Sequence, residues 1–225
     1  MSGSTTGFRR IALLVEGQTE EAFVNTLLAP SALSREVFLT PIVVKTSATP
    51  TGSRKGGGGW KGYDSMLIEL LRQPHWHRVG LMIDYYGYPP GAPGRDQRRF
   101  DTGNRRQLTE ELTSHYGSPA AADRFHPLIV KHEFESLVLA AIDAGAGDGV
   151  MPGKALRSLR AAIKQAGAPE DVNDGASTSP SKRIEHAYPR YSKTLDGIRL
   201  IEEVGLTAVL ERCPVFNAWW QELLA

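Results

Sequence analysis

Two glutamates near the start of the chain, Glu16 and Glu20, are spaced so that both carboxylates could meet at one point. The apolar residues 11–15 are typical of a buried strand, and Thr19, Glu20 and Glu21 are typical of the capped, acid-rich start of a helix. Two carboxylates that close raise each other's pKa unless a cation joins them, so a hard divalent metal is the expected occupant. The alternative for Glu20 is that it only stabilises the helix N-terminus, where the helix dipole favours acids.

Further acids stand at two later junctions between a strand and a helix. Asp84 closes the apolar residues 79–84, and Glu133 and Glu135 follow a strand expected over residues 125–131. The carboxyl ends of parallel strands meet at one edge of a sheet, so these acids should converge with the first two glutamates. Oxygen-only ligands favour Mg²⁺ or Mn²⁺ over zinc. Single acids at such positions are often helix caps, and this reading stays open for Glu135.

Basic residues in three segments could contact phosphates. They lie in a glycine-rich loop over residues 46–62, in an arginine-rich stretch after Asp84 and near residue 182. The candidate nucleic-acid-binding residues are Arg54, Lys55, Arg95, Arg98, Arg99, Lys182 and Arg183. Lys193 is a candidate for neutralising the charge that develops on a phosphate during hydrolysis. The alternative for these residues is an ordinary solvated surface.

The composition excludes several other classes of protein. The chain has 225 residues, 41% of them hydrophobic, which is enough for a substantial core. It contains no run of eighteen apolar residues and no signal peptide, so we expect a cytoplasmic protein without membrane insertion. The single cysteine, Cys213, excludes an internal disulfide and a cysteine-based zinc site.

The order of the expected elements predicts an α/β fold. Strands expected over residues 11–15, 37–45, 79–84 and 125–131 alternate with helices, which indicates a mostly parallel sheet covered on both faces. Pro30 is expected to end the first helix, and Pro41 to place the second strand at an edge. From Met151 onward we expect only helical segments, with a break over residues 169–180. The predicted domains are an α/β core over residues 1–150 and a helical extension, packed on that core, over residues 151–225.

Two of these motifs resemble the TOPRIM fold, which topoisomerases, primases and the OLD-type (overcoming lysogenization defect) nucleases share. Glu16-Gly17-Gln18-Thr19-Glu20 resembles the OLD-type first motif, and Met82-Ile-Asp84 with the tyrosines after it stands where the second motif belongs. Many TOPRIM enzymes carry a second aspartate where this chain has Tyr86. That departure leaves open whether one or two metal ions bind, or whether Glu133 or Glu135 supplies the missing ligand.

Nearly the whole chain more closely resembles a bacterial TOPRIM-like family of unknown function, often encoded beside an ATPase. The motifs that carry this resemblance are Lys131-His-Glu-Phe-Glu135, Pro169-Glu-Asp-Val-Asn-Asp174, Ser179-Pro-Ser-Lys-Arg183 and Tyr191-Ser-Lys193. The resemblance implies a TOPRIM-like (Rossmann-like) core and a possible ATPase partner in a bacterial defence system against phage.

Residues and resemblance together predict a Mg²⁺- or Mn²⁺-dependent nuclease, with DNA the expected substrate. The expected catalytic residues are Glu16, Glu20, Asp84 and Lys193, and the expected metal ligands are Glu16, Glu20, Asp84, Glu133 and Glu135. The alternative is a non-catalytic or weakly catalytic partner module of an ATPase complex. A histidine-based metal hydrolase is disfavoured, because the six histidines form no His-Glu-x-x-His pattern. Three tyrosines could stack on bases or pack under their loop: Tyr85, Tyr86 and Tyr88.

Overall fold

The computed structural model describes seven segments of the chain: residues 7–44, 59–85, 87–95, 104–117, 123–130, 134–172 and 179–225. Several residues predicted from the sequence to be functional lie outside these segments. They are the candidate metal ligand Glu133, the candidate phosphate contacts Arg54, Lys55, Arg98 and Arg99, and Tyr86.

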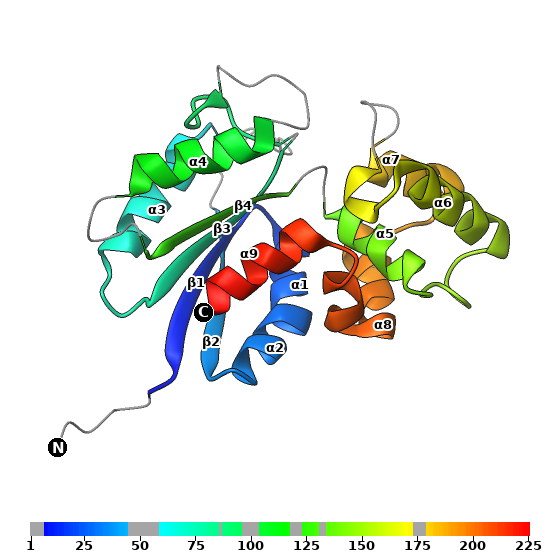
Figure 1. The fold of residues 1–225 in the computed structure, drawn as a ribbon, viewed down its shortest axis with the longest axis horizontal. Helices are drawn as coiled ribbons and strands as arrows, with labels where there is room; N and C mark the ends of the chain where they lie inside the picture. The colour runs from blue at the N-terminus through cyan, green and yellow to red at the C-terminus, as the bar shows by residue number, and fades with distance from the viewer. Residues whose placement is uncertain are drawn as a thin grey trace, which may run out of the picture.

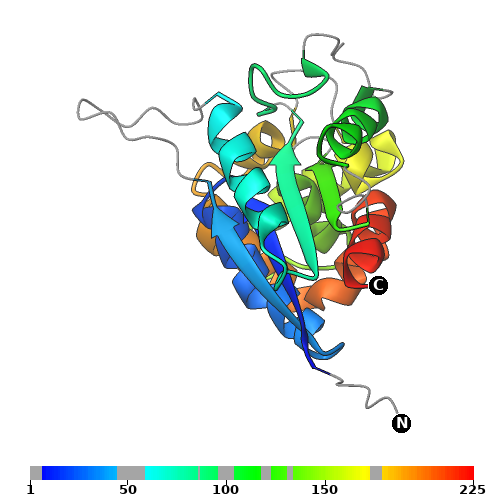
Figure 2. The same cartoon turned by 90° about the vertical axis from the view of Figure 1, so that its left-hand side faces the viewer.

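Within the described segments, four parallel strands form one sheet in the order β2-β1-β3-β4. The strands are β1 Arg9–Val15, β2 Val37–Val43, β3 Arg78–Asp84 and β4 Phe125–Val130, and Figure 2 shows them side by side. Val15 pairs with Met82, and Asp84 pairs with Val130. The carboxyl ends of β1, β3 and β4 therefore reach the same edge of the sheet.

Alternate residues of β1 face two separate hydrophobic cores, as a strand buried on both faces requires. Ala12 and Leu14 pack in the core that contains α3 (Lys61–Arg72) and α4 (Asn104–Tyr116). Ile11 and Leu13 pack in the larger core, formed with helices from both ends of the chain. Figure 1 shows α3 and α4 on one side of the sheet and α1 (Gln18–Phe23), α2 (Ala29–Leu33) and α9 (Pro214–Leu224) on the other. The predicted α/β class is thus confirmed, with a Rossmann-like arrangement and C-terminal helices.

The first helical segment continues past Pro30, so the prediction that this proline ends it is wrong. The segment consists of α1 (Gln18–Phe23), a π-helical turn η1 (Val24–Leu28) and α2 (Ala29–Leu33). Pro30 stands in the first turn of α2, where the missing backbone N–H is tolerated. The π-helical turn before it separates α1 from α2, so that α2 begins as a new helix within one continuous helical segment.

Pro41 was expected to place the second strand at an edge, and this prediction is confirmed. In the described part of the chain, β2 pairs with β1 and closes one side of the sheet. An edge strand tolerates proline because only half of its backbone groups are needed in the ladder.

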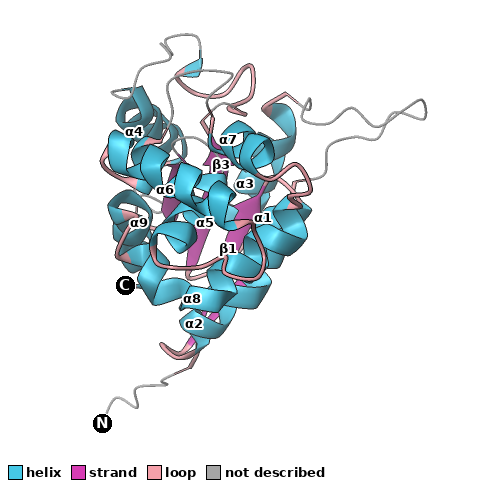
Figure 3. Ribbon diagram, turned by 90° about the vertical axis from the view of Figure 1, so that its right-hand side faces the viewer, coloured by secondary structure: helices cyan, strands magenta, loops and turns pink. Residues whose placement is uncertain are grey.

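The helices and helical turns are the regular elements among the described residues after β4, and an isolated β-bridge joins Asp148 and Met151. The helical elements are α5 (Glu135–Asp143), α6 (Gly153–Ala166), a 3₁₀ turn η3 (Pro169–Asp171), α7 (Pro180–Ala187), a π-helical turn η4 (Lys193–Gly197), α8 (Ile198–Leu210) and α9 (Pro214–Leu224). Helix α7 was not predicted, since Pro180 looked like part of a break. It is instead a helix-starting proline. Figure 3 shows α5, α6 and α8 in front of the strands.

The C-terminal helices pack on the rest of the molecule through the larger core. That core includes Leu137 of α5, Leu159 of α6 and Leu200 of α8, together with Trp220 of α9. Helix α9 lies against β4, where the Trp219 indole donates a hydrogen bond to the His126 carbonyl at 3.0 Å. The predicted domain boundary at residue 150 stays a prediction, but side chains from both sides of it share one core.

No helix among the described residues is long and apolar enough to cross a membrane.

Candidate functional site

Four acids and one lysine converge at the carboxyl edge of the sheet. Glu16 directly follows β1, Asp84 is the last residue of β3, and Glu135 begins α5 after β4. Glu20 comes from the first turn of α1. Lys193, from η4, places its ammonium nitrogen 3.6 Å from a Glu20 carboxylate oxygen and 3.4 Å from a Glu135 carboxylate oxygen. The structure therefore brings together the described acids and the lysine that the sequence had singled out.

The start of α1 differs in detail from the prediction. The residue before the helix is Gly17, in an extended conformation, and no side chain caps the first turn. Thr19 is not the cap. Its hydroxyl lies 3.0 Å from the Thr194 hydroxyl and so connects α1 to η4. This contact holds the backbone beside Glu20 against the backbone beside Lys193.

The turn that carries Lys193 is fixed by its own hydrogen bonds. The Ser192 hydroxyl accepts from the Leu195 N–H, and the Ser192 N–H donates to the Asp196 carboxylate at 2.8 Å. The ammonium of Lys193 lies 5.7 Å from the centre of the Phe134 ring, within reach of a cation–π contact. The backbone of Lys193 is thus held in place, while 35% of its side chain remains exposed to solvent.

Lys193 remains protonated at neutral pH. Burial alone would lower the pKa of its ammonium, but Glu135, Asp84 and Glu20 together outweigh that effect and raise this pKa above its usual value. A group so stabilised in its charged form supplies one fixed positive charge to the site.

Two acids of the cluster, Asp84 and Glu16, have pKa values above those of ordinary carboxyls. Burial raises the pKa of Asp84 well above its usual value; Lys193 acts against this, and Glu16, among other acids, adds to it. Burial and the neighbouring Glu20 likewise raise the pKa of Glu16, although Lys193 acts in the opposite direction. The cluster contains four acids and one lysine, and an additional cation would lower the pKa of these carboxyls.

Tyr63 belongs to the surroundings of the site, and sequence reasoning missed it. It is a buried residue of α3, and burial together with Glu16, Asp84 and Glu20 raises the pKa of its phenol. Nothing in the sequence marks this tyrosine, because its helical spacing is that of an ordinary core residue. Only the packing of α3 beside the strand ends brings it near the acids.

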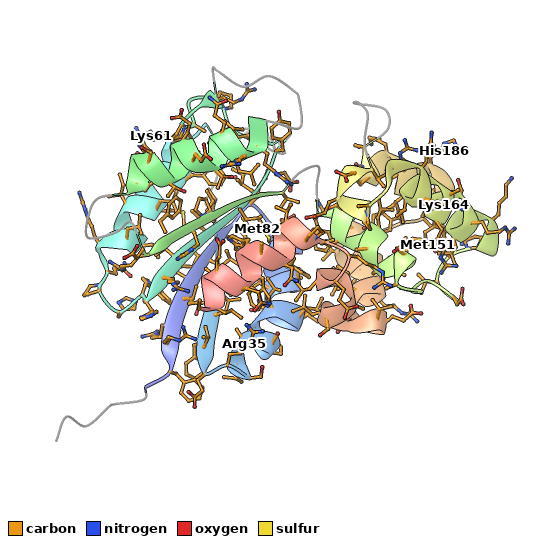
Figure 4. All side chains as sticks on the ribbon, viewed as in Figure 1. Arg35, Lys61, Met82, Met151, Lys164 and His186 are labelled. Atoms are coloured by element: carbon orange, nitrogen blue, oxygen red, sulfur yellow. The ribbon has the colours of Figure 1, made fainter. Side chains whose placement is uncertain are left out.

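A small pocket opens at the cluster. Its volume of about 10 Å³ is roughly that of one water-sized occupant. The lining residues are Glu16, Glu20, Met82, Asp84, Val130, Phe134 and Leu137. Figure 4 labels Met82 on β3. The lining thus combines three carboxylates with apolar side chains, so charges in the pocket are poorly screened by water.

Gly87 lies directly against the Glu16 carboxylate. A side chain at Gly87 would place its first carbon 3.3 Å from one Glu16 carboxylate oxygen and 3.6 Å from the Asp84 side chain. The absence of a side chain here leaves room for Glu16 to turn towards the pocket.

The donor set fits a hard divalent ion, since carboxylate oxygens are the ligands that Mg²⁺ and Mn²⁺ prefer. As the side chains stand, no three acid, histidine or cysteine residues of the described segments are grouped closely enough to hold a metal. The ammonium of Lys193 lies among the carboxylates instead. The sequence-predicted ligand Glu133 is outside the described residues.

The described basic residues that were predicted to bind nucleic acid have other contacts. The Arg95 guanidinium donates to the Tyr88 carbonyl at 3.0 Å. Lys182, on α7, pairs with Glu185 at 2.7 Å, and Arg183 follows it on the same helix. Tyr85 and Tyr88 are 5% and 1% exposed, so these two tyrosines pack under their loop rather than present a stacking surface.

Glu170, in one of the motifs that carry the family resemblance, has a structural role. Its carboxylate accepts hydrogen bonds from the Val215 and Phe216 N–H groups at 3.1 and 3.2 Å. These groups belong to the first turn of α9, which needs such acceptors. Burial raises the pKa of Glu170, while these hydrogen bonds and Arg105 act to lower it.

These features define a parallel α/β protein with a cluster of acids and one lysine at the carboxyl edge of its sheet. The chain belongs to the family described as domain of unknown function DUF4276, which it matches over residues 15–224. No curated protein and no solved structure is significantly similar to it. The TOPRIM resemblance and the nuclease activity stay predictions.

Proposed function

We propose that this protein hydrolyses phosphodiester bonds of nucleic acid with the help of Mg²⁺ or Mn²⁺, and that DNA is its substrate. The observation that carries the proposal is the convergence of Glu16, Glu20, Asp84 and Glu135 with Lys193 at the carboxyl edge of the sheet. This is the edge at which α/β proteins bind their ligands.

The acids would bind the metal, and Lys193 would contact the phosphate. The carboxylate oxygens of Glu16, Glu20, Asp84 and Glu135, with Glu133 as a further candidate, would hold one or two ions. A bound ion would supply Lewis-acid polarisation of the phosphate and activation of water. The apolar wall formed by Val130, Phe134 and Leu137 limits access of bulk water and so strengthens these electrostatic effects.

Lys193 would bring a positive charge to the scissile phosphate. Its ammonium is protonated, partly exposed and within 4 Å of two of the acids. A cation so placed can stabilise the charge that grows on the phosphate oxygens as the bond breaks. The remaining arginines and lysines would follow the nucleic-acid backbone, among them Arg95, Lys182 and Arg183, and binding should weaken as salt rises.

The proposal includes a cellular setting. The resemblance to a TOPRIM-like family often encoded beside an ATPase suggests that the protein works with an ATPase in defence against phage. The chain has a single cysteine, which suits the reducing cytoplasm.

A second candidate is a non-catalytic or weakly catalytic module of an ATPase complex. The observation that favours it is the pairing of Lys193 with Glu20 and Glu135, which partly balances the acids without a metal. Co-purification with an ATPase, together with the lack of any Mn²⁺-dependent rise in melting temperature, would favour this candidate.

The test is Mn²⁺-dependent nicking of supercoiled plasmid by the protein and by Glu16→Gln. Because outer-shell partners of a metal already contribute 10–100-fold, losing a direct ligand should reduce nicking by about a hundredfold or more. Glu202→Gln, an exposed change on α8, is the matched control and should nick normally. Equal nicking by Glu16→Gln and the unchanged protein, with both variants folded by circular dichroism, would rule out the proposed activity.

A further inference from the structure

We propose that Lys193 is a built-in counter-ion of the acidic cluster, and that its ammonium must leave its present position before a divalent ion can bind. This proposal rests on the metal site of the proposed function and adds a step of regulation to it. The observation that carries it is that the ammonium of Lys193 lies within 4 Å of the carboxylates of both Glu20 and Glu135.

The positions of the charges make the ammonium and a metal ion competitors. The ammonium lies 3.6 Å from Glu20 and 3.4 Å from Glu135, and both carboxylates are largely buried, with 12% and 3% of their side chains exposed. An ion that used these oxygens would come within a few ångströms of the lysine charge. Two positive charges that close repel strongly where water is scarce.

The pocket beside the cluster has a volume of about 10 Å³, enough for one small occupant, and the carboxylates that line it are those of Glu16, Glu20 and Asp84. An ion there would gain Glu135 as a ligand only if Lys193 released that carboxylate. In the described segments no three ligand-type side chains surround a common point while the lysine is in place. Release of the ammonium would free oxygens of Glu20 and Glu135 to turn towards Asp84 and Glu16.

The side chain of Lys193 can move while hydrogen bonds hold its backbone in place. Ser192, Asp196 and the contact between Thr19 and Thr194 fix the turn on which Lys193 stands. The lysine stem is flexible, and 35% of the side chain is already exposed, so the ammonium has a route towards solvent. The displaced ammonium then becomes available to a phosphate, so that metal binding precedes engagement of the substrate by Lys193.

The first test compares Mn²⁺ binding by the full chain and by Lys193→Met, measured calorimetrically. Methionine retains much of the side-chain volume without the charge, so we expect Mn²⁺ to bind about tenfold more tightly. In the metal-free state Lys193→Met should melt at a lower temperature, because the acids lose their counter-ion, and Mn²⁺ should raise its melting temperature more than that of the unchanged protein.

The second test uses the unchanged protein and therefore does not depend on how the variant folds. Lysine acylation by a water-soluble anhydride is followed by mass spectrometry with and without saturating Mg²⁺. The acylation rate of Lys193 should rise severalfold with Mg²⁺. Lys164, an exposed lysine of α6 that Figure 4 labels, is the internal control, and its rate should stay constant.

The outcomes separate this proposal from the proposed function. Equal or weaker Mn²⁺ binding by Lys193→Met, or a Lys193 acylation rate that Mg²⁺ leaves unchanged or lowers, would overturn the counter-ion role while the metal site stands. Failure of both proteins to bind Mn²⁺ at all would overturn the metal site and the counter-ion role together.

Discussion

The lack of a side chain at Gly87 lets the backbone pass close to the Glu16 carboxylate. Substitution of this single residue therefore tests whether the position of Glu16 matters for metal binding. In Gly87→Ala the new methyl group would stand 3.3 Å from a Glu16 oxygen, tighter than an ordinary contact. Since the glutamate end is flexible, we expect it to be pushed aside at little cost in stability. Mn²⁺ affinity should fall by about tenfold, the effect of disturbing a ligand's support.

The control for this variant is Gly59→Ala. An added methyl group there meets its nearest neighbour, the Pro90 carbonyl oxygen, at an ordinary 3.7 Å. Calorimetric titration with Mn²⁺ checks both proteins. If Gly87→Ala bound Mn²⁺ as tightly as Gly59→Ala, the position of Glu16 would not matter for the metal.

Glu16 and Asp84 could be located from the sequence because each directly follows an apolar run, and a parallel sheet brings the carboxyl ends of its strands together. Lys193 was singled out by resemblance and by its chemistry. Its place between Glu20 and Glu135 depends on a contact that spans most of the chain, which no local pattern encodes. Tyr63 could not be found at all, since a tyrosine on the buried face of a helix has the same pattern whether or not acids lie beyond it.

At the scale of elements, Glu170 links η3 to the start of α9. Glu170→Ala removes the acceptor for two buried or part-buried N–H groups of the first turn. Loss of such a cap should lower the free energy of unfolding by about 1–3 kcal/mol. Urea denaturation measures this, with Glu202→Ala, an exposed glutamate of α8, as the matched control. Equal stability of the two variants would show that α9 does not need the Glu170 cap.

The elements that were predicted well from the sequence are those in which apolar residues recur at a regular spacing. The strands and α3 repeat apolar residues at the spacing that a buried face requires. The errors fall where a proline or a π turn changes the meaning of that pattern. Pro30 was expected to end a helix and Pro180 to lie in a break between helices, and both stand in first turns. The sequence alone does not distinguish a proline that ends one helix from a proline that begins the next.

At the scale of the whole molecule, the last helix ties both ends of the chain to the amino edge of the sheet. Arg9 donates to the Ala225 carbonyl at 2.7 Å, and Arg78 donates to the Leu223 carbonyl at 3.2 Å. These arginines supply donors to the carbonyl groups that the end of α9 leaves without helical partners. Arg9 and Arg78, at the amino edge of the sheet, are thus part of the packing of α9.

The positive charge at this edge of the sheet makes the free energy of unfolding sensitive to acid through His126. Burial and the charge of Arg78 lower the pKa of His126 below its usual value of 6.5, although Asp123 acts in the opposite direction. A histidine with a lowered pKa in the folded state favours unfolding when it is protonated. Its contribution to stability is complete above pH 6.5 and is lost as the pH falls through the pKa of the folded state.

The expected result is a smaller acid-induced loss of stability in His126→Gln than in the unchanged protein. The free energy of unfolding in urea, measured at pH 8 and at pH 5.5, gives that loss. His186→Gln, an exposed change on α7 that Figure 4 allows the reader to locate, should lose as much as the unchanged protein. Identical losses in all three proteins would show that His126 is not the acid-sensitive group.

The contact between Thr19 and Thr194 joins the two parts of the acidic site across 175 positions of the chain. During synthesis at about 5–20 residues per second, Glu16, Asp84 and Glu135 emerge several seconds before Lys193. A nascent chain therefore carries the acids first, without their lysine and without α9 over the sheet. The assembly of this edge therefore waits until Lys193 has left the ribosome.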